Sequence, residues 1–236
     1  MENFVTMLMD SYRYYDLAKG ATDPKMRTEY WDLVLINDIQ RKFPDAWFEC
    51  GFAYYEMGDY QTAIERLNPA TEDDPSPYRA YNTRGCAKDE LKDYLGAIQD
   101  FNTCIEMNSS CAYAYLNRAN TKSKIGDTVG AIIDLTKAIE LKPDYFEAYA
   151  NRSTGRAILE DFPGALSDIE MAIMMKPNLN TLYLQRGILY FNFKKFNESA
   201  KDFAKSLSLT PPENKTQIDH IDSLVKKAVE KARLNY

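Results

Sequence analysis

The sequence repeats at a step of 34 residues through most of its length. Aromatic residues form one row at this step, small residues form a second row four positions later, and rows of alanine, large apolar residues and proline keep the same spacing. A period of this length indicates that each repeat is one supersecondary element, which buries its apolar face only by stacking on its neighbours. The chain is therefore expected to form a repeat array. The aromatic row is Trp47, Tyr81, Tyr115, Tyr149 and Tyr183, and the small row is Gly51, Gly85, Ala119, Ser153 and Gly187.

Each repeat is predicted to contain two helices. The segment Met57–Tyr60 has a glycine, which suits a helix end, followed by an aspartate, which suits the N-cap of the next helix. The small residue lets the two helices approach closely, and a large residue of the second helix fills the space beside it. The large residues are Leu67, Phe101, Leu135, Ile169 and Phe203, and the five repeats span residues 44–77, 78–111, 112–145, 146–179 and 180–213.

This pattern closely resembles the tetratricopeptide repeat (TPR) family, in which an aromatic residue, a glycine, alanines and a proline recur at fixed offsets. The resemblance covers residues 44–213. It implies an all-α fold, a right-handed superhelix (an α-α solenoid) of about five helix pairs with a concave groove. It also implies a non-enzymatic function, because repeats of this family bind peptides or partner proteins. We therefore expect an interaction adaptor or scaffold.

Residues 1–43 and 214–236 flank the repeats without matching them. Helices at about 2–19 and 25–42 would form an N-terminal helical pair, as a degenerate repeat or a cap for the open end of the array. Alternatively, their aromatic residues would form a homodimer surface. One last helix, at about 216–234, has a single apolar stripe, and the resemblance implies that it is the C-terminal capping helix. The N-terminal aromatic residues are Phe4, Tyr12, Tyr14, Tyr15 and Trp31.

Pro69 falls inside the expected second helix of the first repeat. Proline lacks the N–H that an interior helical turn needs, and its ring clashes with the preceding turn. We expect this helix to end early, near Asn68, and the acidic segment 72–77 to form a loop.

Arginine and aspartate form two more rows at the same step, the arginines in first helices and the aspartates in second helices. Because packing brings the two helices together, the rows are expected to meet, with pairs either within a repeat or between repeats. The arginines would either capture a phosphate or carboxylate ligand or form structural ion pairs. We favour structural pairs because an acid accompanies every arginine. The rows are Arg84, Arg118, Arg152 and Arg186, and Asp100, Asp134, Asp168 and Asp202.

The resemblance implies that side chains of the first helices line the concave groove. Asn117, Asn151 and Gln185 occupy one offset in three successive repeats. An amide side chain both donates and accepts, so it can pair with the backbone of an extended peptide; the alternative is that these are solvated polar residues on an exposed face. The candidate peptide-binding residues are Tyr113, Asn117, Asn120, Glu147, Asn151, Leu184, Gln185, Ile188 and Phe191.

The charges of the expected groove favour a neutral or basic partner segment with apolar anchors. Acidic residues outnumber basic ones there, and apolar residues gather toward the C-terminal end. A clamp for an acidic C-terminal tail is disfavoured. Among the positions that form this clamp in the family, only Asn117 matches, and Glu147 stands where a cation is required. The groove charges are Asp45, Glu49, Glu56, Asp89, Glu90 and Glu147 against Arg79 and Lys124.

Several functional classes are disfavoured by what the sequence lacks. It has one His and four Cys without a paired-Cys motif, no catalytic motif and no phosphate-binding loop, so we expect no metal, no cofactor and no enzyme. A net charge of −6 disfavours nucleic acid. The absence of a long apolar window and of a signal-like N-terminus favours a cytoplasmic protein with reduced thiols, one disulfide being the alternative. Other functions left open are a self-associating structural module and a chaperone for a secreted or assembled client.

Overall fold

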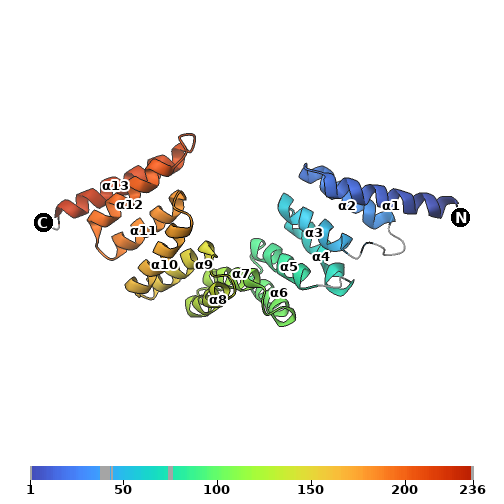
Figure 1. Cartoon of the computed structure of the whole chain (residues 1–236), viewed down its shortest axis with the longest axis horizontal. Coiled ribbons are helices and arrows are strands. Elements are labelled where there is room, and N and C mark those ends of the chain that lie inside the picture. The colour runs from blue at the N-terminus through green and yellow to red at the C-terminus, as the bar shows by residue number, and fades with distance from the viewer. Residues whose placement is uncertain (1, 38–42, 44, 74–76, 235–236) are drawn as a thin grey trace. The chain divides into compact units, whose positions relative to one another are not determined.

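The structure is a computed structural model that describes residues 2–37, 43, 45–73 and 77–234. These residues form 13 helices and no strand (Figure 1). The all-α prediction is confirmed. The helices divide into two compact units, an N-terminal unit of residues 1–125 and a C-terminal unit of residues 126–236.

In the N-terminal unit, each helix packs against the next along the chain. The first helix of each pair contributes small residues to the interface and the second contributes large ones. The helices are α1 (Glu2–Gly20), α2 (Pro24–Asn37), α3 (Ala46–Met57), α4 (Tyr60–Asp73), α5 (Tyr78–Glu90), α6 (Tyr94–Met107) and α7 (Ala112–Lys124).

The C-terminal unit shows the same stacking of successive helices. It ends in the longest helix of this unit, whose Ile221 and Ala228 are fully buried against Phe203 of the preceding helix. The helices are α8 (Thr128–Leu141), α9 (Phe146–Ile158), α10 (Phe162–Met175), α11 (Asn180–Asn192), α12 (Phe196–Leu209) and α13 (Lys215–Leu234).

The glycines of the small row lie directly against the large residues of the same repeat. A Cβ on Gly187 would lie 2.6 Å from two ring atoms of Phe203, and a Cβ on Gly85 would lie 2.7 Å from Phe101. Both rings are buried to 1% exposure or less. The two helices can therefore pack at this distance only because the side chain of the first helix is absent.

In four repeats an aspartate caps the second helix: Asp59 accepts from the Thr62 N–H at 3.2 Å, and the other three share one geometry. The carboxylates of Asp93, Asp127 and Asp161 each accept a hydrogen bond from a backbone N–H three residues later, at 3.1, 2.9 and 3.0 Å. The donor in each case is the N–H of a glycine. These bonds satisfy N–H groups that the helix itself leaves without partners.

Removing one such cap should destabilise the chain by about 1 kcal/mol. Asp161→Ala leaves the Gly164 N–H without its carboxylate acceptor, and urea unfolding followed by circular dichroism measures the loss. The matched control is Asp144→Ala, an exposed aspartate whose side chain forms no hydrogen bond with the described residues. The control should stay within about 0.5 kcal/mol of the wild type; an equal loss in both variants would mean that the cap is not the cause.

The N-terminal helical pair packs on the first repeat through its aromatic residues. Trp31, 2% exposed, meets the ring of Tyr15 edge-on at 5.4 Å, and Tyr15 stacks on Phe43 at 4.4 Å. Tyr12 also contacts the Phe43 ring, at 5.0 Å. These three aromatic side chains are thus used inside the unit, while the side chain of Phe4 and residues 38–42 of the expected second helix lie outside the described part of the chain.

The prediction that the second helix of the first repeat ends near Asn68 is wrong. Helix α4 continues through Pro69 to Asp73. Pro69 removes only one N–H donor, while the turn that follows it is held by packing: Ala70 is fully buried. The guanidinium of Arg84 on α5 also donates to Asn68 Oδ1 at 3.0 Å and to Thr71 Oγ1 at 3.3 Å. These tertiary contacts outweigh the local preference.

Candidate functional site

The arginine and aspartate rows form ion pairs within repeats. Arg152 donates from Nε and Nη2 to both carboxylate oxygens of Asp168, at 2.9 and 2.8 Å. Arg84 binds Asp100 in the same way at 2.9 and 2.7 Å, and Arg186 binds Asp202 at 2.7 and 2.9 Å. The hydrogen bond from Arg186 to Asp202 raises the pKa of Arg186. Two parallel bonds fix each pair in one geometry.

Two of these aspartates accept a second cation. Lys88 Nζ lies 2.8 Å from Asp100 Oδ2, and Arg156 Nη1 lies 2.9 Å from Asp168 Oδ2. Both carboxylates are 3% exposed. The cations are therefore directed at buried acids between two helices, and this supports the structural interpretation of the rows.

In the third repeat, the arginine and the aspartate lie on the same helices as in the other repeats. Arg118, on α7, donates from Nη1 to Asn102 Oδ1 at 2.6 Å. Asp134, on α8, is buried at 2% exposure. The arginine is thus on a first helix and the aspartate on a second helix, as the spacing predicts.

The four tyrosines of the aromatic row have a second role, which the sequence did not predict. The guanidinium carbons of Arg84, Arg118, Arg152 and Arg186 lie 5.0, 5.5, 5.6 and 5.7 Å from the ring centres of the tyrosines three residues earlier. Residues three apart share a helix face, and such contacts between a cation and a ring are attractive. Each arginine is therefore held between a tyrosine ring and a buried or half-buried partner.

A polar hollow of about 270 Å³ lies on the first helices of the N-terminal unit. Asn117 donates from Nδ2 to Asn82 Oδ1 at 3.1 Å and contacts Cys86 Sγ at 3.2 Å. Asp89 accepts from Thr121 Oγ1 at 2.9 Å and forms an ion pair with Lys124. The hollow is lined by Tyr55, Cys86, Asp89, Glu90, Phe101, Asn117, Asn120 and Lys124.

A smaller hollow of about 180 Å³ lies between α9 and α11 of the C-terminal unit. Its most exposed apolar side chains are Ile158, 64% exposed, and Ile188, 43% exposed. Gln185 lies at its edge and donates from Nε2 to the Ala150 carbonyl and to Thr154 Oγ1, both at 2.6 Å. The hollow is lined by Ser153, Thr154, Ala157, Ile158, Gln185, Ile188, Leu189 and Asn192.

The amide row joins neighbouring first helices. The side chain of Asn117 on α7 donates to α5, and that of Gln185 on α11 donates to α9. Asn151 is exposed on α9. The amide donors of Asn117 and Gln185 are thus engaged by the adjacent repeat, a use that we had not predicted, and their binding of a peptide backbone stays a prediction.

The other candidate residues fall into three groups. Asn120 and Ile188 line the hollows. Tyr113 is 55% exposed in the first turn of α7, and Glu147 is exposed in the first turn of α9. Leu184 and Phe191 pack instead against the apolar cluster of α12 and α13. Ile158 also lines the hollow between α9 and α11, and in the sequence it is one of the apolar residues at the expected groove positions of the first helices.

Most of the acidic residues of the N-terminal groove positions are paired. Asp45 lies 3.7 Å from Lys19 Nζ, Glu49 lies 3.6 Å from Arg79, and Glu56 lies 2.7 Å from Arg27. Asp89 is paired with Lys124. Burial raises the pKa of Glu49. The net negative charge of these positions is therefore smaller than the sequence indicated, because Lys19 and Arg27 come from helices outside the repeats.

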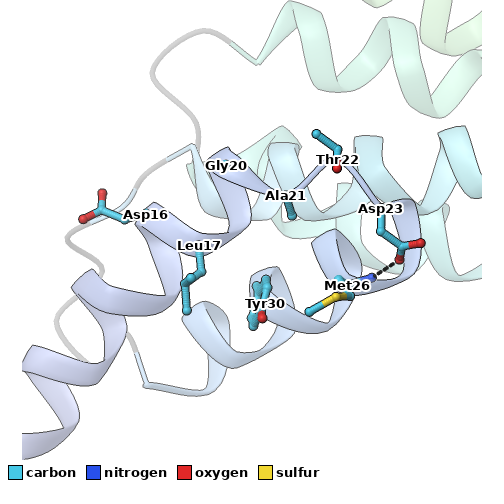
Figure 2. A pocket seen from close by; sticks show the side chains of 8 residues that line it. All are labelled: Asp16, Leu17, Gly20, Ala21, Thr22, Asp23, Met26 and Tyr30. Carbon is cyan, nitrogen blue, oxygen red and sulfur yellow. Dashed lines mark hydrogen bonds between the residues drawn. The ribbon is translucent and has the colours of Figure 1, made fainter.

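A third hollow, of about 330 Å³, lies at the turn between α1 and α2 (Figure 2). Leu17, Met26 and Tyr30 line it together with Asp16 and Asp23, and Asp23 accepts a hydrogen bond from the Met26 N–H at 2.8 Å. The aspartate caps α2 in this way. This hollow could not be predicted from the sequence, because residues 1–43 do not align with the repeats.

Comparison with known proteins identifies the repeats. The family model for the tetratricopeptide repeat matches residues 78–111, 112–145 and 181–213. No curated protein matches the chain. None of the helices formed by the described residues has the length and apolar character required to cross a membrane.

Several solved structures share the fold. The crystal structure of MamA has 23% identity and a TM-score of 0.62, over 71% of this chain and 96% of the MamA chain. TTC0263, a thermophilic TPR protein of Thermus thermophilus, has 16% identity and a TM-score of 0.62, over 77% of this chain and 98% of that chain. The APC/C hetero-tetramer Cut9–Hcn1 has 16% identity and a TM-score of 0.72, over 87% of this chain and 39% of the matched chain. At these identities the likeness shows the fold alone.

Proposed function

Because the chain belongs to the tetratricopeptide repeat family, we propose that it is a non-enzymatic adaptor or scaffold that binds an extended segment of a partner protein. Proteins of this family are generally interaction scaffolds. The partner segment is neutral to basic and has apolar anchors. The protein acts in the cytoplasm, and its net charge of −6 disfavours nucleic acid as the partner.

The observation that supports this proposal best is the hollow between α9 and α11. Ile158 and Ile188 are 64% and 43% exposed at its edge. Full burial of an isoleucine side chain stabilises by about 1.5–3 kcal/mol. A partner side chain placed between the two would therefore gain free energy from both, with Thr154 and Asn192 at the same edge to orient it by hydrogen bonds.

The polar hollow of the N-terminal unit suits a different part of the partner. Glu90 is exposed at its edge and forms no ion pair with the described residues. The Tyr55 hydroxyl, whose pKa burial raises to about 12, stays protonated and can donate a hydrogen bond. A lysine, arginine or polar side chain of the partner fits these groups better than an acidic one.

We expect Ile158→Glu and Ile188→Glu each to weaken partner binding at least about tenfold, a loss of about 1.4 kcal/mol. Affinity purification from the native cell with mass spectrometry identifies the partner, and fluorescence anisotropy with overlapping peptides of that partner measures the affinity. The matched control is Ile133→Glu on α8, because Ile133 is 63% exposed but lies on a second helix. Added salt should weaken binding moderately if a basic side chain contributes.

Two outcomes would contradict the proposed surface. Unchanged affinity in both hollow variants would show that the partner binds elsewhere. An equal loss in Ile133→Glu would show that the effect comes from added negative charge and not from the hollow.

A further inference from the structure

The hollow at the turn between α1 and α2 is the largest of the three described above, and none of its lining residues belongs to a repeat. Leu17 and Met26 are 38% and 45% exposed there, with the ring of Tyr30 between them (Figure 2). Asp16 and Asp23 lie at opposite ends of these apolar side chains (Figure 2). The hollow therefore presents apolar area in its middle and a carboxylate at each end, which suits an apolar side chain flanked by cations.

Both carboxylates are open to a ligand. Asp16 is exposed and forms no ion pair with the described residues. Asp23 is also exposed, and only its Oδ1 accepts the hydrogen bond that caps α2. The nearby cation of α1 is engaged elsewhere, since Lys19 Nζ lies 4.3 Å from the ring centre of Tyr15 and 3.7 Å from Asp45. None of the described residues that line the hollow is a cation, so the positive charge that these acids favour comes from the ligand.

The distribution of charge along the sequence favours a second copy of this chain as the ligand. Residues 1–125, the N-terminal unit, contain 20 acidic and 14 basic residues. Residues 194–236, which include α12 and α13, contain nine basic and six acidic residues. Two N-terminal units therefore repel each other, whereas the C-terminal helices of one copy attract the N-terminal unit of another.

The last turn of α13 has the groups that the hollow requires. Leu234 is 71% exposed, and Lys231 and Arg233 in the same turn form no ion pair with the described residues. Lys231 and Leu234 are three residues apart and share a helix face. Leu95 is comparably exposed, at 76%, but the acidic Asp93 lies two residues before it. The turn of α13 thus combines an exposed leucine with two cations, and this matches an apolar surface with two acids.

We propose that the last turn of α13 of one copy docks into the α1–α2 hollow of a second copy. Leu234 covers Leu17 and Met26, and the two cations of the turn face Asp16 and Asp23. The two surfaces differ, so the contact is heterologous, and every copy offers both a turn and a hollow. This association is independent of the proposed binding function, because it uses neither of the hollows on the first helices of the repeats.

The association is expected to be weak. One helical turn in a hollow buries less than the about 1,200–2,000 Å² of a stable interface, so the dissociation constant should be micromolar or higher. Part of the attraction acts between exposed charges, and added salt should weaken it.

Sedimentation equilibrium of the purified chain, from about 10 to about 500 µM, tests for the contact. The mean mass of the wild type should rise with concentration, and it should rise less when salt is added. A wild type that stays monomeric through this range, or that associates equally well at high salt, would overturn the proposal.

Two variants each remove one side of the contact. Leu17→Lys places a cation in the hollow, Leu234→Glu places an acid on the turn of α13, and each should raise the dissociation constant at least about tenfold. The matched controls are Met9→Lys on α1 and Met174→Glu on α10, because these methionines are 69% and 67% exposed and line none of the described hollows. Both controls should associate like the wild type, and an equal loss in them would contradict the proposed surfaces. Asp16→Lys, at an exposed position, should weaken association as well and keeps the test valid if Leu17→Lys does not fold.

Mixing the two variants tests whether the turn of one copy meets the hollow of another. The mixture contains the intact turn of Leu17→Lys and the intact hollow of Leu234→Glu. It should therefore associate at least about tenfold more tightly than either variant alone. If two variants with the circular dichroism spectrum of the wild type gained nothing on mixing, these two surfaces would not be partners.

Discussion

Replacing Asp168 with alanine should lower the free energy of unfolding by about 3 kcal/mol, the lower end of the range for breaking a buried ion pair. The substitution leaves the guanidiniums of Arg152 and Arg156 without the carboxylate that both now bind. The Arg152 side chain is only 11% exposed, so water replaces its partner poorly. Urea unfolding followed by circular dichroism measures the loss.

The other acids of the chain provide graded comparisons. Asp202→Ala should cost less than Asp168→Ala, because Asp202 accepts one arginine and is slightly more exposed. Glu140→Ala removes an exposed pair with Lys137 and should cost under about 0.5 kcal/mol. If Asp168→Ala weakened partner binding while leaving the unfolding free energy unchanged, the arginine row would be a ligand-binding row after all.

The ion pairs could be predicted from the sequence because they depend on the repeat alone. Arg84 and Asp100 lie 16 residues apart, and so do Arg152 and Asp168. The same helix–turn–helix geometry therefore produces the same contact. The choice between pairing within and between repeats could not be made from the spacing, since it depends on how the two helices cross.

The features that were predicted wrongly or missed depend on contacts outside a single repeat. Pro69 stays within a helix because Ala70 is buried and Arg84 of the next repeat binds the turn around it. The acids at the N-terminal groove positions are paired with Lys19 and Arg27, which belong to helices that do not align with the repeats. A count of charges along the first helices cannot include such partners.

Enlarging a glycine of the small row should also strongly lower the free energy of unfolding. Gly187→Ala should destabilise the chain by about 1–3 kcal/mol, the usual cost of overpacking a core. The added Cβ would lie 2.6 Å from two atoms of the Phe203 ring, which is 1% exposed and has little room to move. Gly20→Ala is the control, since a Cβ there has nothing within 4 Å, and it should cause no loss.

The preceding repeat indicates how the loss can be reversed. There, Ser153 stands at the glycine position, its hydroxyl donates to the Ala165 carbonyl at 2.7 Å, and the large residue of the repeat is Ile169 rather than phenylalanine. The double variant Gly187→Ser/Phe203→Ile should therefore lose less free energy of unfolding than the two single variants together. The difference in a double-mutant cycle should be at least about 1 kcal/mol. If the losses of unfolding free energy of the two single variants simply added, the residue in the small row would not depend on the size of the large residue that it faces. A favourable coupling would show that each repeat selects its small and large residues as a pair, which explains why the two rows vary along the chain while the spacing of 34 residues stays fixed.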